Sequence, residues 1–150
     1  MELKLTDLTP DNWRAINALK VKPEQKKYVA ENLTILARAF AYRLDNSKVH
    51  VICTGDISIG LIMQRDWFNE NKLICILDQF MIDGHYQGKG FGKKAMQLWL
   101  SMIKSEGKYD SIELCFKEGD IAAEKMYKNL GFIRRPELDD EDELVMVYKL

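Results

Sequence analysis

The sequence predicts an α/β (α+β) fold, in which a mixed, mostly antiparallel sheet with flanking helices contains one strand-helix-strand crossover. Residues 48–67 alternate between apolar and polar on both sides of Gly55-Asp56, which is typical of two antiparallel strands joined by a tight turn. Residues 73–82 form a nearly continuous apolar run, as in a strand buried on both faces. A glycine-rich turn and a helical period follow this run, so the second half predicts the crossover.

The first half predicts a short strand and two helices before this hairpin. Residues 3–5 have the apolar alternation of a strand, and Thr9 and Pro10 are typical of a helix start. This first helix is expected to end near Leu19. A longer helix is expected to begin at Pro23. Its apolar residues that share one face at helical spacing are Val29, Leu33, Leu36 and Phe40.

The second half predicts two further helices and three strands. The helix after the glycines is expected to end near residues 106–108, and residues 111–116 form the next strand. The expected buried face of that helix consists of Phe91, Ala95, Leu98 and Met102. Asp120 is placed to cap a last helix that ends at Gly131. The residues of this helix expected to face inward are Ala122, Ala123, Met126, Tyr127 and Leu130. Two strands around an acidic loop then close the chain.

The composition indicates one compact globular domain, expected to span residues 1–150. The chain is 47% hydrophobic and 30% charged, which suits a folded core. Its formal net charge of -1 excludes a strong overall positive field, so neither nucleic acid nor an anionic membrane is expected as a partner. The start of the chain lacks a secretory leader pattern and no apolar run has the length of a bilayer span, so a cytoplasmic location is expected.

The cysteines and histidines do not predict a metal site. Cys53, Cys75 and Cys115 are far apart and odd in number, so we expect core thiols in a reduced compartment. His50 is expected to alternate out of a strand. His85 precedes the glycines without a third ligand at suitable spacing, and no metal is therefore expected.

Gly88, Gly90 and Gly92 stand at alternate positions immediately before a helix. A strand that ends, loops through glycines and opens a helix presents backbone N–H groups at the positive end of the helix dipole, which suits a phosphate. The pattern is neither a nucleotide P-loop nor a dinucleotide fingerprint, because no Gly-Lys-Ser/Thr follows and position 93 is Lys. From these residues alone, a tight turn without any ligand is an equal alternative.

Two segments carry a resemblance to a known family. Residues 87–92, Gln-Gly-Lys-Gly-Phe-Gly, resemble the Q/R-x-x-G-x-G/A motif of the GNAT superfamily of acyl-CoA-dependent N-acetyltransferases. Residues 120–132 resemble the family's N-x-x-A-x-x-x-Y-x-x-x-G-F segment, although Asp120 stands where the family usually has Asn. Residues 19–32, 80–92 and 142–150 resemble the bacterial spermine/spermidine acetyltransferase branch, so the similarity covers nearly the whole chain.

This resemblance implies the GNAT fold and the use of acetyl-CoA as acetyl donor. The pyrophosphate of coenzyme A is expected on the backbone amides of residues 87–92, while the pantetheine arm pairs with the central strand like an added strand. The residues implied in cofactor binding are Phe80, Met81, Ile82, Gln87, Gly88, Lys89, Gly90, Phe91, Gly92, Lys93, Asp120 and Tyr127.

The transfer needs a base for the amine and an acid for the departing thiolate. Tyr127 is the expected acid, because the family match puts it near the sulfur; its alternative is a buried core aromatic. Asp78 is the expected base, because it interrupts an apolar strand where a charge is unfavourable. The alternative is that Asp78 points outward at a strand bend or forms a structural ion pair. Glu113 is the reserve candidate for the base.

An extended polycation is expected to bind spaced carboxylates, for which Glu31, Asp78 and Glu113 are candidates. The acidic run 139–143 either steers cations toward the site or is a solvated hairpin loop. The resemblance to the spermine/spermidine branch implies a direct acetyl transfer to a primary amine of a polyamine. The alternatives are another amine (an aminoglycoside or a protein N-terminus) and a non-catalytic acyl-CoA sensor. Family habit also implies a homodimer.

Overall fold

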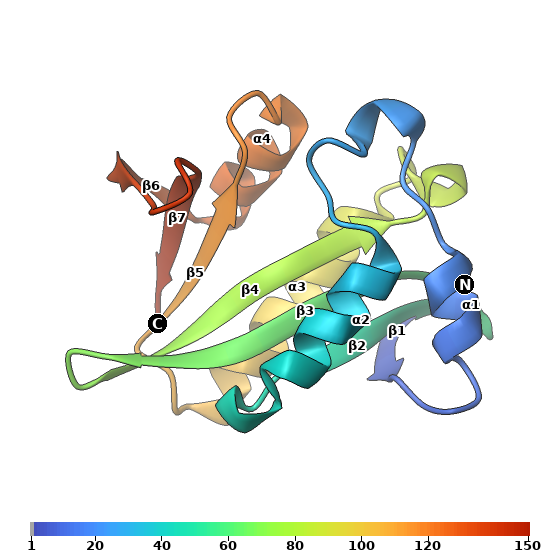
Figure 1. Cartoon of the computed structure of the whole chain (residues 1–150), viewed down its shortest axis with the longest axis horizontal. Helices are drawn as coiled ribbons and strands as arrows, with labels where there is room; N and C mark the ends of the chain where they lie inside the picture. Colours follow the sequence, from blue (N-terminus) through green and yellow to red (C-terminus); the bar gives the residue numbers. More distant parts are fainter. Residues whose placement is uncertain (1) are drawn as a thin grey trace.

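The structure, a computed structural model, describes residues 2–150, within which the strands form one seven-stranded sheet (Figure 1). The strands lie in the spatial order β1-β2-β3-β4-β5-β7-β6. Their bounds are β1 Leu3–Asp7, β2 Lys48–Thr54, β3 Ile57–Asn69, β4 Lys72–Ile82, β5 Ser111–Phe116, β6 Ile133–Leu138 and β7 Leu144–Lys149. The pair β4 and β5 is parallel and the other neighbouring pairs are antiparallel, as the sequence predicts.

The helices follow the predicted order along the chain. Their bounds are α1 Trp13–Ala18, α2 Asn32–Ala41, α3 Phe91–Glu106 and α4 Ile121–Leu130. Three single-turn 3-10 helices among residues 2–150 are η1 Pro23–Gln25, η2 Arg43–Asp45 and η3 Gly84–Tyr86. Among these described helices, none has the length and apolar character needed to cross a bilayer.

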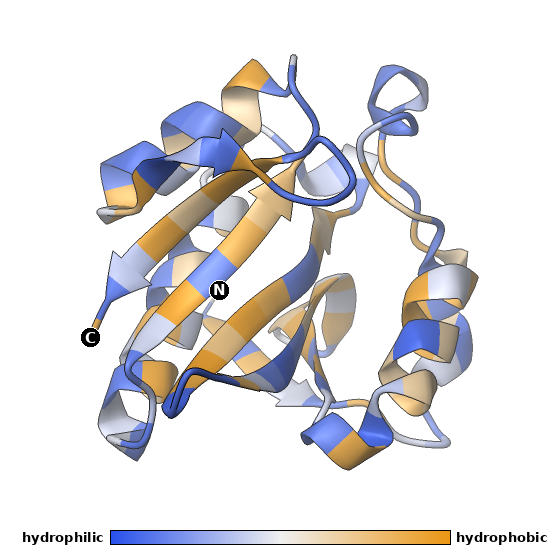
Figure 2. Cartoon of the chain, turned by 60° about the vertical axis from the view of Figure 1, so that its left-hand side comes forward, coloured by the Kyte–Doolittle hydropathy of each residue, from blue (hydrophilic) through white to orange (hydrophobic). Residues whose placement is uncertain are grey.

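The sheet separates two hydrophobic cores. On one face, Ile16 of α1 and Ile35 of α2 pack on Leu61 and Met63 of β3. On the other face, α3 and α4 cover the sheet, with the fully buried Trp99 at the centre of the core. Figure 2 shows why both faces are covered, since the central strands are mostly in hydrophobic colours.

Helix α2 begins later than the sequence predicts. The expected helix from Pro23 is interrupted after η1, and α2 starts at Asn32. The buried face also differs, because Leu33 and Phe40 are exposed. Asn32 is buried instead, and its Nδ2 donates to the carbonyl oxygens of Ile16 at 2.6 Å and Leu19 at 3.2 Å. The carbonyl oxygens at the end of α1 need hydrogen-bond donors, and Asn32 supplies one. For this reason α2 buries a polar residue.

Helix α3 and His50 also differ from the expectation. The buried residues of α3 are Ala95, Met96, Trp99, Leu100 and Ile103. Leu98 is half-exposed rather than buried. His50 is buried, and its Nε2 lies 2.7 Å from Oε1 of Gln64, which also accepts a 2.8 Å hydrogen bond from Nε1 of Trp99. These three buried polar side chains connect β2, β3 and α3 by hydrogen bonds. The spacing of apolar residues does not predict such a contact.

Candidate active site

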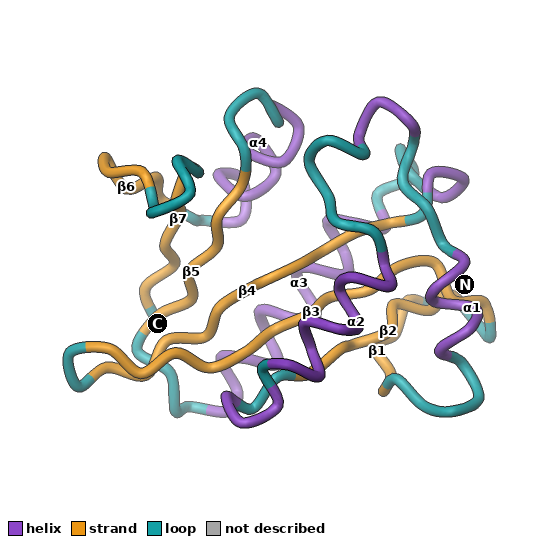
Figure 3. Tube along the Cα trace, in the orientation of Figure 1, coloured by secondary structure: helices purple, strands orange, loops and turns teal. Residues whose placement is uncertain are grey.

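The parallel strands β4 and β5 diverge part-way along their length. They pair from Ile74 with Ser111 to Leu77 with Leu114, after which β4 continues without β5. Figure 3 shows the two strands starting side by side and then separating. In the pairing with β3, Gln64 lies opposite Leu77 while Met63 lies opposite Gln79, which makes Asp78 an unpaired bulge residue. Because a bulge bends its strand, the divergence begins where the pairing is already irregular.

A cleft of about 870 Å³ occupies this divergence. One wall comes from α2 and the segment before it, and the opposite wall comes from β5, α4 and the loop between β6 and β7. The two walls touch where Nζ of Lys117 donates to the carbonyl oxygen of Lys27 at 3.0 Å. A methyl group added to Gly119 would stand 3.2 Å from the hydroxyl of Tyr28. The cleft is therefore bridged across its width by two loops.

The glycine loop presents a row of free N–H groups at the end of this cleft. Within residues 2–150, the backbone N–H groups from Gly88 to Lys93 donate to no protein acceptor, as expected for the first turn of α3. Gly88 and Gly90 have φ angles of +76° and +83°, the left-handed region that glycine adopts most readily, and a Cβ at either would meet open space. Such a cradle suits an anion of phosphate type.

The side chain of Gln87 is engaged in the protein itself. Its Nε2 donates to Oε1 of Gln25 and to the carbonyl oxygen of Ile82, both at 2.8 Å. In return, Nε2 of Gln25 donates to Oε1 of Gln87 at 2.8 Å. The pair ties the glycine loop to η1, so the side chain of Gln87 positions the loop, and its amide group is already hydrogen-bonded within the protein.

Tyr127 reaches the cleft from α4 with its hydroxyl group unbonded. Its side chain packs between Phe116, with ring centroids 6.3 Å apart, and Phe132, at 5.8 Å in an edge-to-face arrangement. The residue is only 7% exposed, and its hydroxyl takes part in none of the side-chain hydrogen bonds of residues 2–150, so this oxygen is not sealed in the core but remains accessible from the cleft. Burial, with a smaller contribution from Asp120, raises the pKa of Tyr127, so the phenol stays protonated and can donate.

Asp78 lies on the cleft floor in an ion-pair cluster. Nε and Nη2 of Arg38 donate to its two carboxylate oxygens at 3.1 and 3.0 Å, and Nε of Arg65 donates to Oδ2 at 2.8 Å. Burial disfavours the charge, but the hydrogen bonds from both arginines outweigh it and lower the pKa of Asp78. A carboxylate that holds its charge so firmly is a poor proton acceptor, so these contacts agree with the structural alternative rather than with the expected base.

The acidic loop forms part of the cleft wall. Asp139, Glu141 and Glu143 line the cleft opposite α2. Oδ1 of Asp139 accepts hydrogen bonds from the N–H groups of Glu141 at 2.9 Å and Glu143 at 2.8 Å, which folds the loop over its own carboxylate. The loop is thus an ordered element that adds negative charge to the site.

Two expected substrate ligands lie elsewhere. Glu31 is exposed at the start of α2 and is not among the cleft-lining residues. Glu113 pairs with Arg135 of β6 at 3.2 Å and also stands outside the cleft. Cys115, expected in the core, is exposed and lines the cleft, whereas Cys53 and Cys75 are buried as expected. Among residues 2–150, no three His, Cys, Asp or Glu side chains gather as a metal site.

A second hollow of about 310 Å³ lies between the start of α3 and α4. Lys93 and Lys125 line it together with apolar side chains that include Met126 and Leu130. Two lysines beside an apolar surface suit the nucleotide end of an anionic ligand. The sequence motif singles out Lys93 but not Lys125, which lies on a different helix.

Comparison with known proteins identifies the family. A sequence model described as the acetyltransferase (GNAT) family matches residues 9–132. The chain belongs to the GNAT acetyltransferase family. The predicted GNAT fold and the predicted family are therefore confirmed.

Two curated relatives of this GNAT protein match over its whole length. The probable spermine N(1)-acetyltransferase of Bacillus subtilis subsp. natto (strain BEST195) is 33% identical over 154 residues. The spermine/spermidine N(1)-acetyltransferase of Bacillus subtilis (strain 168) is 32% identical over 154 residues. Each alignment covers 100% of this chain and 100% of the relative. Family and relatives together identify this protein as an N-acetyltransferase.

A solved structure supports the same fold. The spermidine N-acetyltransferase from Vibrio cholerae, in complex with CoA and spermine, superposes with a TM-score of 0.76. The match covers 98% of this chain and 95% of that chain. At 20% sequence identity, this likeness supports the shared fold alone.

Proposed function

We propose that this GNAT enzyme transfers the acetyl group of acetyl-CoA directly to a primary amine of a polyamine. The observation that carries the proposal is the cleft itself, which combines free backbone N–H groups at Gly88–Lys93 with an acidic wall formed by Asp139, Glu141 and Glu143. The first suits an anionic donor and the second a cationic acceptor. The full-length matches to two spermine acetyltransferases support the same choice of acceptor.

The proposed binding site for acetyl-CoA consists mainly of hydrogen-bonding groups that have no partner within residues 2–150 of the protein. The amides of residues 88–93 would hold the pyrophosphate, and Lys89 would add charge from the loop. The free edge of β4 at Phe80, Met81 and Ile82 would pair with the amides of the pantetheine arm, since β5 leaves this edge unpaired. Lys93 and Lys125 would flank the nucleotide end. Asp120 caps α4 by accepting from the N–H of Ala123 at 3.3 Å, so its contribution is indirect.

Direct transfer is favoured over an acetylated enzyme. Cys115 is the thiol in the cleft wall, and a cysteine nucleophile must first ionise. Although Cys115 is exposed toward the cleft, the part of its surroundings that is protein rather than water, together with the neighbouring Asp139, raises the pKa of its thiol to about 12, so the thiol remains protonated at neutral pH. A covalent relay through this side chain would be slow, and the amine is expected to attack the thioester itself.

A thiol-release assay with acetyl-CoA tests the proposal. The panel contains spermine, spermidine, putrescine, an aminoglycoside and a peptide with a free N-terminus. Spermine or spermidine is expected to give the highest kcat/KM. Turnover of the aminoglycoside or the peptide without turnover of spermidine would overturn the polyamine assignment. Binding of acetyl-CoA without turnover of any amine would instead favour the sensor alternative.

A further inference from the structure

Within residues 2–150, some of the carboxylates that line the cleft have hydrogen-bonding partners in the protein, and others do not. Asp78, on the cleft floor, is held by Arg38 and Arg65. Asp120 caps α4, and Asp139 accepts two backbone N–H groups of its own loop. Each of these three therefore already has hydrogen-bonding partners that stabilise its charge.

Two cleft carboxylates are left, and burial separates them. Glu141 is exposed, whereas Glu143 is partly buried. In the described residues 2–150, the side-chain oxygens of Glu143 accept no hydrogen bond and join no ion pair. A partly buried carboxylate without partners, facing a cleft, is available to accept a proton from a ligand.

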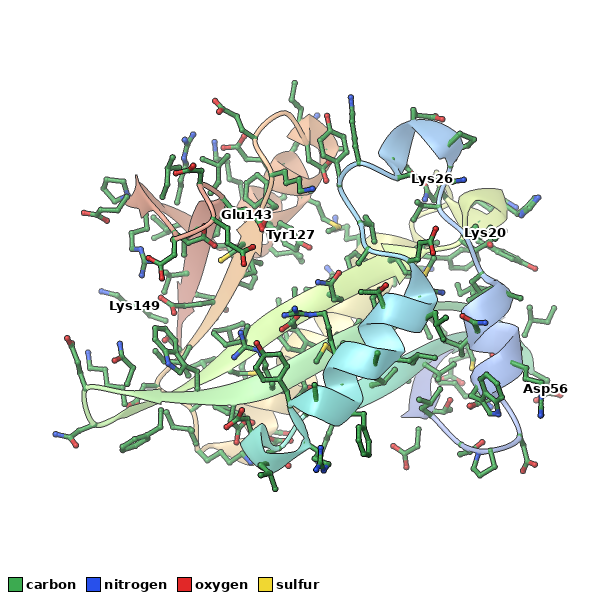
Figure 4. The ribbon with its side chains drawn as sticks, in the orientation of Figure 1. Lys20, Lys26, Asp56, Tyr127, Glu143 and Lys149 are labelled. Atoms are coloured by element: carbon green, nitrogen blue, oxygen red, sulfur yellow. The ribbon has the colours of Figure 1, made fainter. Side chains whose placement is uncertain are left out.

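The backbone holds Glu143 in a defined place on the cleft wall that also carries Tyr127. The N–H of Glu143 donates to Oδ1 of Asp139 at 2.8 Å, and the N–H of Asp139 donates to the carbonyl oxygen of Glu143 at 3.0 Å. The next residue, Leu144, lies opposite Phe116, whose ring packs against Tyr127. In Figure 4 the labels of Glu143 and Tyr127 stand on the side of β5, β7 and α4, with Lys26 on the other side, and all three residues line the cleft.

We propose that Glu143 is the general base of the acetyl transfer and removes a proton from the ammonium group of the acceptor. The proposal rests on the function proposed above, and it replaces Asp78 in the role that the strand pattern suggests. It assigns the two proton-transfer groups of the cleft to the last residue of the loop before β7 and to α4.

The surroundings of Glu143 favour this role. Burial, followed by the charges of Asp139 and Glu141, raises the pKa of Glu143 above its usual value. Lys117, after β5, and Arg38, on α2, are the cations whose charges act against this rise. A carboxylate whose pKa is raised, as in Glu143, is a stronger base than one whose pKa is lowered, as in Asp78.

The proton and electron balance closes without a further reactant. The ammonium group loses one proton to the carboxylate of Glu143, which later returns it to solvent. The nitrogen lone pair then forms the bond to the acyl carbon, and the carbon–sulfur bond breaks with its electron pair leaving on sulfur. The Tyr127 hydroxyl donates a proton to that sulfur and regains one from the nitrogen through solvent. The products are the amide, the free thiol and one released proton.

The test compares Glu143→Gln with the wild type and with Asp140→Asn, a matched loss of one charge at an exposed loop residue outside the cleft lining. With spermidine at neutral pH, Glu143→Gln is expected to lose at least about 100-fold in kcat, the lower range of general base catalysis. Its KM for spermidine and its affinity for acetyl-CoA should change little. Asp140→Asn should keep the wild-type kcat.

Two further measurements separate a base from a binding residue. Trifluoroethylamine is neutral at the assay pH and needs no deprotonation, so the defect of Glu143→Gln should largely disappear with this amine. Added formate should partly restore turnover to Glu143→Ala. An equal defect with both amines, a change in KM alone, or wild-type kcat in Glu143→Gln would overturn the proposal. Failure of the wild type with every polyamine would instead overturn the proposed function.

Discussion

Arg38 of α2 and Asp78 of β4 form a two-point contact, in which Nε and Nη2 of the guanidinium donate to separate carboxylate oxygens at 3.1 and 3.0 Å. The carboxylate is only 3% exposed, and Arg65 donates a third bond from the neighbouring strand. The cluster therefore joins a helix and two strands at the bulge where β4 and β5 begin to separate. Asp78 lies in the cleft, where a catalytic carboxylate would be expected, but its hydrogen bonds to two arginines are those of a structural ion pair.

Asp78→Asn is expected to destabilise the protein, and it is expected to leave the acid limb of the pH–rate profile largely unchanged. Removing the shared anion leaves two arginines close together, one of them partly buried, and should lower the free energy of unfolding by about 3 kcal/mol. Urea unfolding monitored by tryptophan fluorescence measures this change. Glu113→Gln is the control, since it breaks an exposed pair with Arg135 and should cost about 1 kcal/mol or less. A shifted acid limb with unchanged stability would restore Asp78 as the base.

The stability of the protein should fall as the pH drops below about 6.5, the ordinary pKa of histidine. Burial lowers the pKa of His50 in the folded protein. The unfolded chain then binds a proton that the folded chain does not, so each acidic step below the unfolded pKa favours unfolding. Between pH 7 and 8 this residue should contribute no slope.

Unfolding free energies measured from about pH 5 to pH 8 test the role of His50. His50→Gln should flatten the acidic limb, even if it lowers overall stability. His85→Gln is the matched control, because the His85 ring is 91% exposed beside Asp83. An acidic limb that persists in His50→Gln and disappears in His85→Gln would contradict the prediction.

Gly90→Val should raise the KM for acetyl-CoA before it affects the KM for the amine. The φ angle of +83° strains any β-branched residue by roughly 1–2 kcal/mol, and relief of that strain would turn the amides of the loop away from the donor. Gly107→Val provides a matched control at the other end of α3, where φ is +66° and the surroundings are also open. An increase in the amine KM alone would contradict the assignment of this loop to the donor.

Tyr127→Phe should lower kcat by about 100-fold while the fold is retained. Phenylalanine keeps the packing against Phe116 and Phe132, but it cannot donate a proton to the departing sulfur. Tyr148→Phe is the control for loss of a hydroxyl, since Tyr148 packs on Phe132 from β7 and does not line the cleft. Steady-state kinetics and a thermal melt measure the two effects, and an unchanged kcat would leave Tyr127 as a core aromatic.

Local patterns predicted most of the secondary structure because short-range preferences decide it. The turn at Gly55-Asp56, the apolar strand ending at Ile82 and the cap at Asp120 all lie where the sequence predicts them. The buried faces of α2 and α3 were predicted less well. Both helices carry apolar residues on more than one side, so contacts with other elements determine which side is buried.

The sequence by itself determined the order of the elements, the glycine loop and the family, since each depends on residues that are neighbours in the chain. The tertiary structure decided which partners each carboxylate has. Asp78 is separated from Arg38 by 40 positions, and only the packing of α2 on the sheet brings the two together. In the sequence, Glu143 is only one member of an acidic run. In the structure, the loop folds over Asp139 and the side chain of Glu143 lines the cleft. Charge partners determine whether a carboxylate is structural or reactive, and those partners come from distant parts of the chain.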